Sequence, residues 1–485
     1  MNVFDYLFEQ SHDLEKDFVL GSHQQITFNK LYEISTKLAN KLNSVIGENK
    51  QVIILSENSI FQITAYLSIL KSGNICVPLN PAIESENLDQ ILAKTTVNYA
   101  FISKRYKEKY KNCSFEILDD DFVKAIETAD ITYEAIPEEF DDSRLAEIIF
   151  TSGSTGEQKG VLISHKNIIA NTNSIVEYLQ LTSLDTMEVV LPFYYCYGLS
   201  LLHTHLKVGG SIVMNNNFIF IGSVLNDINK YKCTGFAGVP SHYQILLRKT
   251  RDFKTTSFPS LRYVTQAGGK LHVTFIKEFV DAFPAINFYV MYGQTEATAR
   301  LSYLPPEKLL AKTGSIGKGI PGVTLQVVNE IGEMVNQGET GEIIAKGDNI
   351  MIGYLNEPEE TARTIRNGWL YTGDLAQMDE DGFIFIQSRK KEIIKVGGIR
   401  ISPQEIEEAI VTYPGVIGCT IEAIPDELLG EAVKATVFIN EVDKEDFSEE
   451  LIKKYCASML AMQKIPKVVV FETKLPYNAS GKKVK

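Results

Sequence analysis

The chain has 485 residues, of which 44% are hydrophobic and 22% charged, and its formal net charge is −13. This composition is typical of a globular protein, and the length predicts two or more domains because single cores stop growing near ~250–300 residues. The negative charge disfavours nonspecific binding to nucleic acid or to an anionic membrane, although a local loop could still bind ATP. We therefore expect no nucleic-acid partner.

Cysteine spacing and apolar runs bear on the compartment. None of the six cysteines lies in a C-x-x-C pair, which favours reduced thiols in a cytosolic protein. Residues 1–16 carry no basic segment followed by a long apolar one, and no apolar run approaches the ~18 residues of a membrane span. We expect a cytoplasmic enzyme with no membrane span.

The first half of the chain alternates strands and helices. Residues 52–55 predict a buried strand, residues 59–70 a helix that Gly73 ends, and residues 75–78 the next strand. This rhythm predicts a parallel sheet. The mainly polar residues 103–145 are expected to form peripheral structure.

A loop rich in glycine and hydroxyl groups follows a strand predicted at 147–150. Glycines permit positive φ and expose consecutive N–H groups that form a nest for anions, and Lys159 adds a positive charge. The loop is therefore predicted to hold a polyphosphate; the alternative is a plain turn between a strand and a helix. The motif G-x-x-x-x-G-K-[ST] is not matched, which disfavours a P-loop enzyme. The loop reads Thr151-Ser152-Gly153-Ser154-Thr155-Gly156-Glu157-Gln158-Lys159-Gly160.

The same rhythm continues beyond this loop. In open α/β sheets ligands lie past the carboxyl ends of strands, so residues 151–160, 266–270 and 292–296 are candidate ligand loops. The expected helices are 164–179, 198–208 and 239–247, and the expected strands are 188–191, 211–214, 261–265 and 286–291.

From about residue 313 the pattern changes to alternation at period two, with a hairpin turn at 379–382. This pattern predicts an antiparallel, barrel-like subdomain over about 313–388. A polar break at 388–391 predicts a boundary between an N-terminal domain, 1–388, and a C-terminal α+β domain, 389–485. In the C-terminal domain we expect strands at 392–395, 416–424 and 432–439, a helix opened by a capping box at 402–405 and ending near 412, and a helix at 449–462.

Five segments carry a family resemblance when they are taken together in order. They are Thr151 to Gly160, Tyr292-Gly293-Gln294-Thr295-Glu296, Tyr371-Thr372-Gly373-Asp374, Arg389 with Lys395 to Pro403, and Asn478-Ala479-Ser480-Gly481-Lys482. From about residue 25 to 485, the chain resembles the adenylate-forming (AMP-binding) superfamily of acyl-CoA synthetases, peptide-synthetase adenylation domains and luciferases. The resemblance implies a large N-terminal domain of parallel α/β sheets, a small β-barrel-like subdomain and a small mobile α+β C-terminal domain.

The resemblance also implies a reaction in two halves. A carboxylate attacks the α-phosphate of MgATP to give an acyl-adenylate and pyrophosphate, and a thiol then displaces AMP. The charge that develops on phosphorus must be met by positioned cations and N–H donors.

Residue roles follow from the resemblance by position. Lys482 is expected to bridge the substrate carboxylate and the α-phosphate, Thr295 to donate to the α-phosphate, and Glu296 to bind Mg²⁺. The other expected ATP-binding residues are Thr151, Ser152, Gly153, Ser154, Thr155, Gly156 and Lys159 at the phosphates, Gly268, Gly269, Tyr292, Gly293 and Gln294 near the adenine, and Asp374 and Arg389 at the ribose. Lys391 is expected at a hinge, with Gly397 and Gly398 beside a pantetheine channel.

Each of these residues also has an ordinary alternative role, which the sequence leaves open. Glu296 could be a helix N-terminal acid, Tyr292 a core residue and Arg389 a linker cation. Asp374 could be an ordinary turn residue, and Lys482 a solvated lysine of the tail.

The sequence says less about the identity of the two co-substrates, the carboxylic acid and the thiol. Residues 191–199 contain no aspartate that could pair with a substrate ammonium, so we expect a carboxylic acid without an α-ammonium group. Tyr195 stands where many acyl- and aryl-CoA ligases have histidine; it and Tyr197 could line and narrow the acid pocket or belong to the core. The thiol is either CoA, which we favour, or the phosphopantetheine arm of an acyl or peptidyl carrier protein. A nonenzymatic nucleotide-binding scaffold remains an alternative, although Lys159, Glu296, Asp374 and Lys482 are all present.

Overall fold

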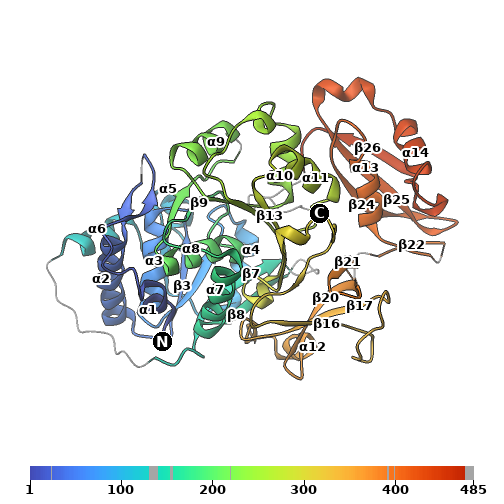
Figure 1. Ribbon diagram of the computed structural model, residues 1–485. Helices are drawn as coiled ribbons and strands as arrows, with labels where there is room; N and C mark the ends of the chain where they lie inside the picture. The colour runs from blue at the N-terminus through green and yellow to red at the C-terminus, as the bar shows by residue number, and fades with distance from the viewer. Residues whose placement is uncertain are drawn as a thin grey trace.

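The computed structural model describes residues 1–22, 24–129, 140–152, 157–218, 220–389, 393–397 and 399–475. The blue and green part of the chain forms a large lobe of sheets and helices, the orange part a small β subdomain, and the red part a separate lobe (Figure 1). The predicted α/β fold class is confirmed. Among the described residues, no helix combines the length and apolar character needed to cross a membrane.

The first sheet has seven strands in the order β18-β8-β7-β4-β3-β5-β6, and its β7, β4, β3, β5 and β6 run parallel. The predicted strand–helix–strand unit is present as β3 (Gln51–Leu55), α3 (Ile60–Lys71) and β4 (Ile75–Leu79). The Ser59 side chain caps α3, and the helix is buried on nearly all sides. The other elements here are α1 (Val3–Phe8), α2 (Phe28–Ile46), α4 (Ser85–Lys94), β5 (Tyr99–Ile102), α5 (Lys104–Tyr110), β6 (Glu116–Leu118), α6 (Asp120–Thr128), β7 (Leu145–Ser152), β8 (Gln158–Ser164) and β18 (Gly353–Tyr354).

The phosphate-type loop connects two strands of one hairpin. Strands β7 and β8 pair antiparallel, with Thr151 opposite Lys159 and Ser152 opposite Gln158. The alternative of a turn between a strand and a helix is therefore wrong. The next helix begins only after β8, at a capping box formed by Ser164 and Asn167.

The second sheet has nine strands in the order β15-β14-β13-β12-β11-β9-β10-β1-β2, and the six from β13 to β1 in that order run parallel. The predicted helices and strands of this region are present, with boundaries that differ by no more than two residues. The elements are β1 (Asp17–Leu20), β2 (Ile26–Thr27), α7 (His165–Leu179), β9 (Thr186–Val189), α8 (Cys196–Val208), β10 (Ser211–Met214), α9 (Ile221–Lys230), β11 (Gly235–Gly238), α10 (Pro240–Arg248), β12 (Tyr263–Gln266), α11 (Val273–Ala282), β13 (Asn287–Tyr292), β14 (Ser302–Leu304) and β15 (Lys318–Gly319).

Strand β11 is not predicted by the sequence, which has Gly-Phe-Ala-Gly in place of an apolar run. Its glycines make room for aromatic rings of neighbouring elements. A Cβ at Gly235 would lie 2.5 Å from the Tyr263 ring, and one at Gly238 would lie 2.9 Å from the Tyr243 ring. Tertiary packing therefore selects these residues over strand formers.

A buried polar chain joins α3, β7 and α8. The Tyr66 hydroxyl lies 3.0 Å from Glu147 Oε2 and 2.7 Å from His203 Nε2. Burial raises the pKa of Glu147 to about 7 and lowers the pKa of His203 to about 3. Between about pH 3 and pH 7, the three side chains therefore form a mainly uncharged network in which Glu147 is protonated.

We expect Glu147→Gln to change how stability depends on pH. Between the ordinary pKa of 4.5 and the folded value of about 7, the native protein holds a proton that the unfolded chain releases. The contribution of Glu147 to the free energy of unfolding therefore falls as pH rises through this window. Urea unfolding across pH 4 to 8 should show the wild type losing stability relative to the variant between these values. A constant difference across the series would contradict the raised pKa.

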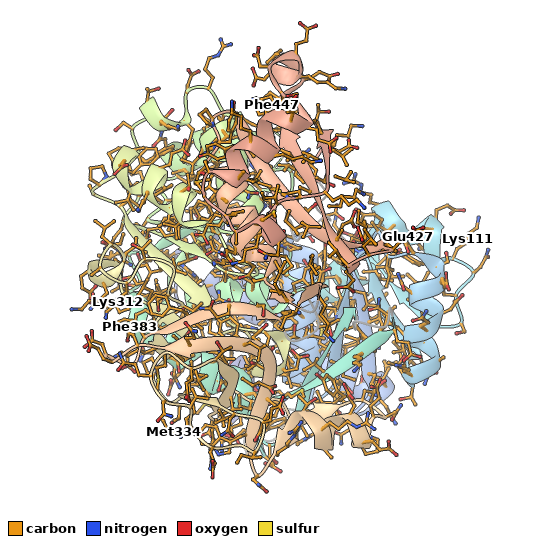
Figure 2. All side chains as sticks on the ribbon, turned by 90° about the vertical axis from the view of Figure 1, so that its right-hand side faces the viewer. Lys111, Lys312, Met334, Phe383, Glu427 and Phe447 are labelled. Carbon is orange, nitrogen blue, oxygen red and sulfur yellow. The ribbon has the colours of Figure 1, made fainter. Side chains whose placement is uncertain are left out.

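The small β subdomain is antiparallel, as expected. Its predicted turn at 379–382 is present, with Gly382 at φ +79° and its amide bonded to the Asp379 carbonyl. Lys312 pairs with Asp379 at 2.8 Å and lies 5.1 Å from the Phe383 ring, and Figure 2 shows Lys312 and Phe383 together at one edge. The elements are β16 (Thr324–Val328), β17 (Gly341–Lys346), α12 (Pro358–Thr364), β19 (Ile365–Arg366), β20 (Trp369–Met378) and β21 (Ile384–Arg389).

The C-terminal lobe has its own five-stranded sheet, of which Glu427 and Phe447 mark opposite ends (Figure 2). The predicted capping box is wrong, because the Ser402 hydroxyl donates to the Gln387 carbonyl at 2.7 Å instead of capping its own helix. The last helix is shorter than predicted and ends at Ala457. The elements are β22 (Ile394–Val396), β23 (Ile399–Ile401), α13 (Pro403–Val411), β24 (Val416–Asp426), β25 (Gly430–Ile439), α14 (Glu449–Ala457) and β26 (Val468–Glu472).

The C-terminal lobe contacts the second sheet's helices α10 and α11. Arg248 on α10 donates to the Val416 carbonyl, and Lys270 lies 3.3 Å from Glu408 on α13. These are a few polar contacts on the rim of a shared apolar surface. The predicted boundary at 388–391 falls partly outside the described residues and stays a prediction, as does mobility of the lobe.

Candidate active site

The loop after β13 is central to the site, and it folds back tightly on itself. The Leu301 amide bonds to the Tyr292 carbonyl at 2.9 Å, and a short 3₁₀ turn, Thr295–Ala297, lies between them. A Cβ at Gly293 would lie 2.1 Å from the Ala299 carbonyl oxygen, so only glycine fits there. The loop thus holds Thr295 and Glu296 in fixed positions beyond the strand end.

Gly293→Ala is expected to destabilise the protein by about 1–3 kcal/mol, because the new methyl group meets a backbone oxygen that cannot move aside. Gly269→Ala is the matched control. Its Cβ would lie 3.3 Å from the nearest atom, a ring carbon of Pro240. Thermal unfolding of both variants measures the difference, and equal losses of Tm would show that the close approach at Gly293 is not what matters.

At one end of this loop lies a buried carboxylate. Asp374 accepts a hydrogen bond from the Tyr292 hydroxyl at 2.6 Å and pairs with Arg389 Nε at 3.1 Å. Asp374 and Arg389 are direct cross-strand partners on β20 and β21, and the Arg389 side chain is 62% exposed. Burial and the neighbouring Asp374 raise the pKa of Tyr292 far above its usual value, so its hydroxyl remains a donor.

Glu296 lies in the 3₁₀ turn in the middle of the loop. Its Oε1 accepts from the Tyr354 hydroxyl at 2.8 Å, and its carbonyl accepts from the Met351 amide at 2.9 Å. The Tyr354 ring lies 5.3 Å from Lys159 Nζ, which in turn pairs with Glu360 at 2.6 Å. Burial next to Glu296 raises the pKa of Tyr354. Glu296, Tyr354, Lys159 and Glu360, here called the Lys159 cluster, connect the loop to the β7–β8 hairpin.

The donor set suits a magnesium ion held mainly by phosphates. No group of three or more metal-ligating side chains occurs among the described residues. Mg²⁺ at nucleotide sites is held by one or two carboxylates together with phosphate oxygens and water. A single carboxylate, Glu296, beside a lysine fits that pattern.

Thr295 and the glycines at 268–269 are the other described residues that the sequence analysis expects near the nucleotide. Thr295 Oγ1 lies 3.7 Å from Cys196 Sγ at the start of α8. Gly268 has φ +83°, which favours glycine, and the Gly269 carbonyl accepts from Gln266 Nε2 at 2.7 Å. The structure therefore brings the ends of β12 and β13 next to α8.

The expected pocket residues lie at the start of α8. Tyr197 is buried, and its hydroxyl lies 2.9 Å from Thr265 Oγ1; its ring faces the guanidinium of Arg300 at 4.0 Å. The rings of Tyr194 and Tyr195 are 4.9 Å apart. Sequence reasoning missed Arg300, Tyr354 and Glu360, because they belong to no motif and reach the site only through folding.

Several expected site residues lie outside the described residues. Gly397 is described, with φ +56° and its amide bonded to the Leu429 carbonyl at 3.0 Å. The side chain of Ser152 is not described, whereas its backbone belongs to β7. The expected residues outside the described ones are Gly153, Ser154, Thr155, Gly156, Lys391, Gly398 and Lys482.

Comparison with known proteins decides the family. The pattern of AMP-binding enzymes matches residues 8–355, and that of the AMP-binding enzyme C-terminal domain matches residues 405–482. The chain belongs to the AMP-binding enzyme family. The predicted family and the predicted class of enzyme, an AMP-forming acid–thiol ligase, are thereby confirmed.

Relatives in this family are similar over nearly their whole length. The oxalate–CoA ligase of Arabidopsis thaliana is 29% identical, covering 94% of this chain and 91% of the relative, and a feruloyl-CoA synthase of Amycolatopsis is 30% identical, covering 95% and 92%. The structure of o-succinylbenzoate CoA synthetase from Bacillus subtilis with ATP and a magnesium ion has a TM-score of 0.86 at 25% identity, covering 99% of this chain and 98% of that one.

Proposed function

We propose that this AMP-binding enzyme joins a carboxylic acid to CoA in two steps through an acyl-adenylate. The observation that carries the proposal is the loop after β13, whose Tyr292 contacts the buried Asp374 and whose Glu296 is joined through Tyr354 to Lys159. This spacing suits a nucleotide whose ribose and triphosphate must be held at once.

In the first step, a carboxylate oxygen of the acid attacks the α-phosphorus of ATP and the bond to pyrophosphate breaks. Asp374 and Arg389 hold the ribose hydroxyls, while Lys159 and the N–H groups of the 151–160 loop hold the β- and γ-phosphates. Thr295 and Lys482 stabilise the charge developing at the α-phosphate. Glu296 would hold Mg²⁺ together with the phosphates, and the ion would supply further neutralisation of charge.

Lys159 has to change partners during this step. Its ammonium group is paired with Glu360 at 2.6 Å. A triphosphate carries more negative charge than one carboxylate, so the ammonium moves toward it. The Tyr354 ring, 5.3 Å away, lies against the ammonium group in the pair with Glu360.

In the second step, a thiolate attacks the acyl carbon and AMP leaves. We propose that the C-terminal lobe rotates at Lys391 between the steps, withdrawing Lys482 and bringing Gly397 and Gly398 to a pantetheine channel. CoA is the proposed thiol because the relatives compared above are named as CoA ligases or synthetases. A carrier protein is the second candidate.

The relatives are named for acids as different as oxalate and ferulate, so their names do not define the acid substrate of this enzyme. Residues 191–199 contain no carboxylate for an ammonium group, which supports an acid without one. A cytoplasmic location is supported by six free cysteine thiols and by the use of ATP.

Acid-dependent exchange of labelled pyrophosphate into ATP tests the proposal. Exchange that requires an added carboxylic acid is expected, with AMP released when CoA is supplied. Release of ADP would indicate the P-loop class, and no exchange with any acid would indicate a nucleotide-binding scaffold. Replacing CoA by a pantetheinylated carrier protein then distinguishes the two thiols.

A further inference from the structure

Arg300 is a buried cation that has no negatively charged partner within the part of the chain that the structure describes. The residue is 2% exposed and follows the loop that carries Thr295 and Glu296. Its Nε donates to Met291 Sδ at 3.4 Å and its Nη1 to the Ala299 carbonyl at 3.2 Å, and the Tyr178 hydroxyl is also within its reach. No carboxylate of the described residues forms an ion pair with it.

Such an environment is unusual for a guanidinium group. Arginine is almost never fully buried unless it is paired, because removing the charge from water is costly. The group has five N–H donors, and its described partners are a thioether, a carbonyl and a hydroxyl. All three of these partners are uncharged at neutral pH, so none of them balances the charge of the guanidinium.

The Arg300 guanidinium lies close to the region where the acid substrate is proposed to bind. Its guanidinium lies 4.0 Å from the centre of the Tyr197 ring, on the first turn of α8. The preceding residue, Cys196, lies 3.7 Å from Thr295, where the α-phosphate is proposed to bind. An acid whose reacting carboxylate is beside Thr295 would therefore extend along the start of α8 toward Arg300.

Arg300 also occupies the face of Tyr197. An aromatic acid would need a ring surface on which to stack, and here the guanidinium already covers that surface at cation–π distance. The hydroxyl of Tyr197 is fixed by Thr265, so the ring cannot swing freely to expose its face. A guanidinium group over the Tyr197 ring therefore favours a substrate whose far end is negatively charged over a substrate whose far end is an aromatic ring.

We propose that Arg300 binds a second carboxylate of the substrate, which makes the acid a dicarboxylic acid activated at one end. This inference rests on the proposed function and adds its substrate class. One carboxylate reacts with ATP, and the other pairs with the buried guanidinium in a fork geometry. Binding of the diacid supplies the negative charge that the folded chain lacks at this position.

The test compares each acid with its own monomethyl ester. Malonic, succinic, glutaric and adipic acids and their monomethyl esters keep nearly the same size and differ in one charge. In acid-dependent pyrophosphate exchange, the wild type should show a kcat/KM for its best diacid ~100-fold or more above that for the ester. An equal rate for diacid and ester would overturn the inference and leave Arg300 as a structural cation.

Variants then assign the preference to this residue. Arg300→Met should reduce the ratio of diacid to ester to near one, and Arg300→Lys should reduce it partially because the fork is lost. Arg262→Lys is the matched control: Arg262 also lies over a tyrosine ring, Tyr263 at 4.6 Å, but is paired with Asp185 at 2.9 Å. Arg262→Lys should leave the ratio unchanged.

The outcomes separate this inference from the proposed function. Exchange with monocarboxylic acids and no preference for diacids would overturn the role of Arg300 alone. Absence of exchange with every acid would overturn the proposed function itself. If Arg300→Met does not fold, the wild-type ratio and the Arg300→Lys variant still decide the question.

Discussion

Lys482→Ala is expected to slow formation of the acyl-adenylate by about 100–1000-fold, the usual effect of losing one preorganised group at a developing charge. A cation ~4 Å from a unit negative charge contributes about 4 kcal/mol at an effective dielectric of 20, which is the same order. Acid-dependent pyrophosphate exchange measures this step. Transfer from preformed acyl-adenylate to CoA should stay near the wild-type rate, because Lys482 is proposed to act only in the first step.

Lys485→Ala is the control for the lysine at 482, since it removes a charge from the same C-terminal segment. It should leave both steps unchanged. Normal exchange in Lys482→Ala, or an equal loss in the two steps, would contradict the assigned role.

Glu296→Gln should lower kcat/KM for ATP by about 100-fold or more, because it removes the one carboxylate proposed for Mg²⁺. Glutamine keeps the size of the side chain and an oxygen that can accept from Tyr354, so the fold is expected to persist. Activity measured over a series of Mg²⁺ concentrations should show the variant needing more Mg²⁺.

Glu360→Gln is the matched control for this prediction, because it removes a carboxylate from the same Lys159 cluster. It releases Lys159 from its ion pair, so ATP should bind at least as well as in the wild type, with the Mg²⁺ requirement unchanged. An unaltered Mg²⁺ requirement in Glu296→Gln would show that this carboxylate does not hold the metal.

The sequence predicts those parts of the fold that depend on local pattern. The buried run 52–55 and the capped helix after Ser59 are found as expected, because apolar spacing and a side-chain cap act within a few residues. Strand β11 could not be predicted, since its glycines are selected by the rings of Tyr243 and Tyr263 from other elements. The capping box failed for the same reason: Gln387 offers Ser402 a different acceptor.

In the candidate site, too, some features follow from local sequence pattern and others only from tertiary packing. Short motifs identify Asp374, Glu296 and Lys159, and the family comparison supports the activity that they imply. The partners that these residues meet could not be read from the motifs. Tyr354 reaches Glu296 across 58 positions of the chain, and Glu360 reaches Lys159 across 201. The role proposed for Arg300 depends on its burial and on its position over the Tyr197 ring, and neither can be predicted from the sequence.

Strand β18 lies in the sequence between β17 and β19 of the small β subdomain, yet it pairs with β8 of the first sheet, with Tyr354 opposite Val161. The backbone that carries Lys159 is thus hydrogen-bonded to the stretch that leads to Asp374. One hydrogen-bonded framework therefore fixes the distance between Asp374, proposed to bind the ribose, and Lys159, proposed to bind the terminal phosphates. Rotation of the C-terminal lobe at Lys391 would leave this framework unaltered, so the proposed ribose contacts of Asp374 could keep the adenylate in place after pyrophosphate has left and until the thiol arrives.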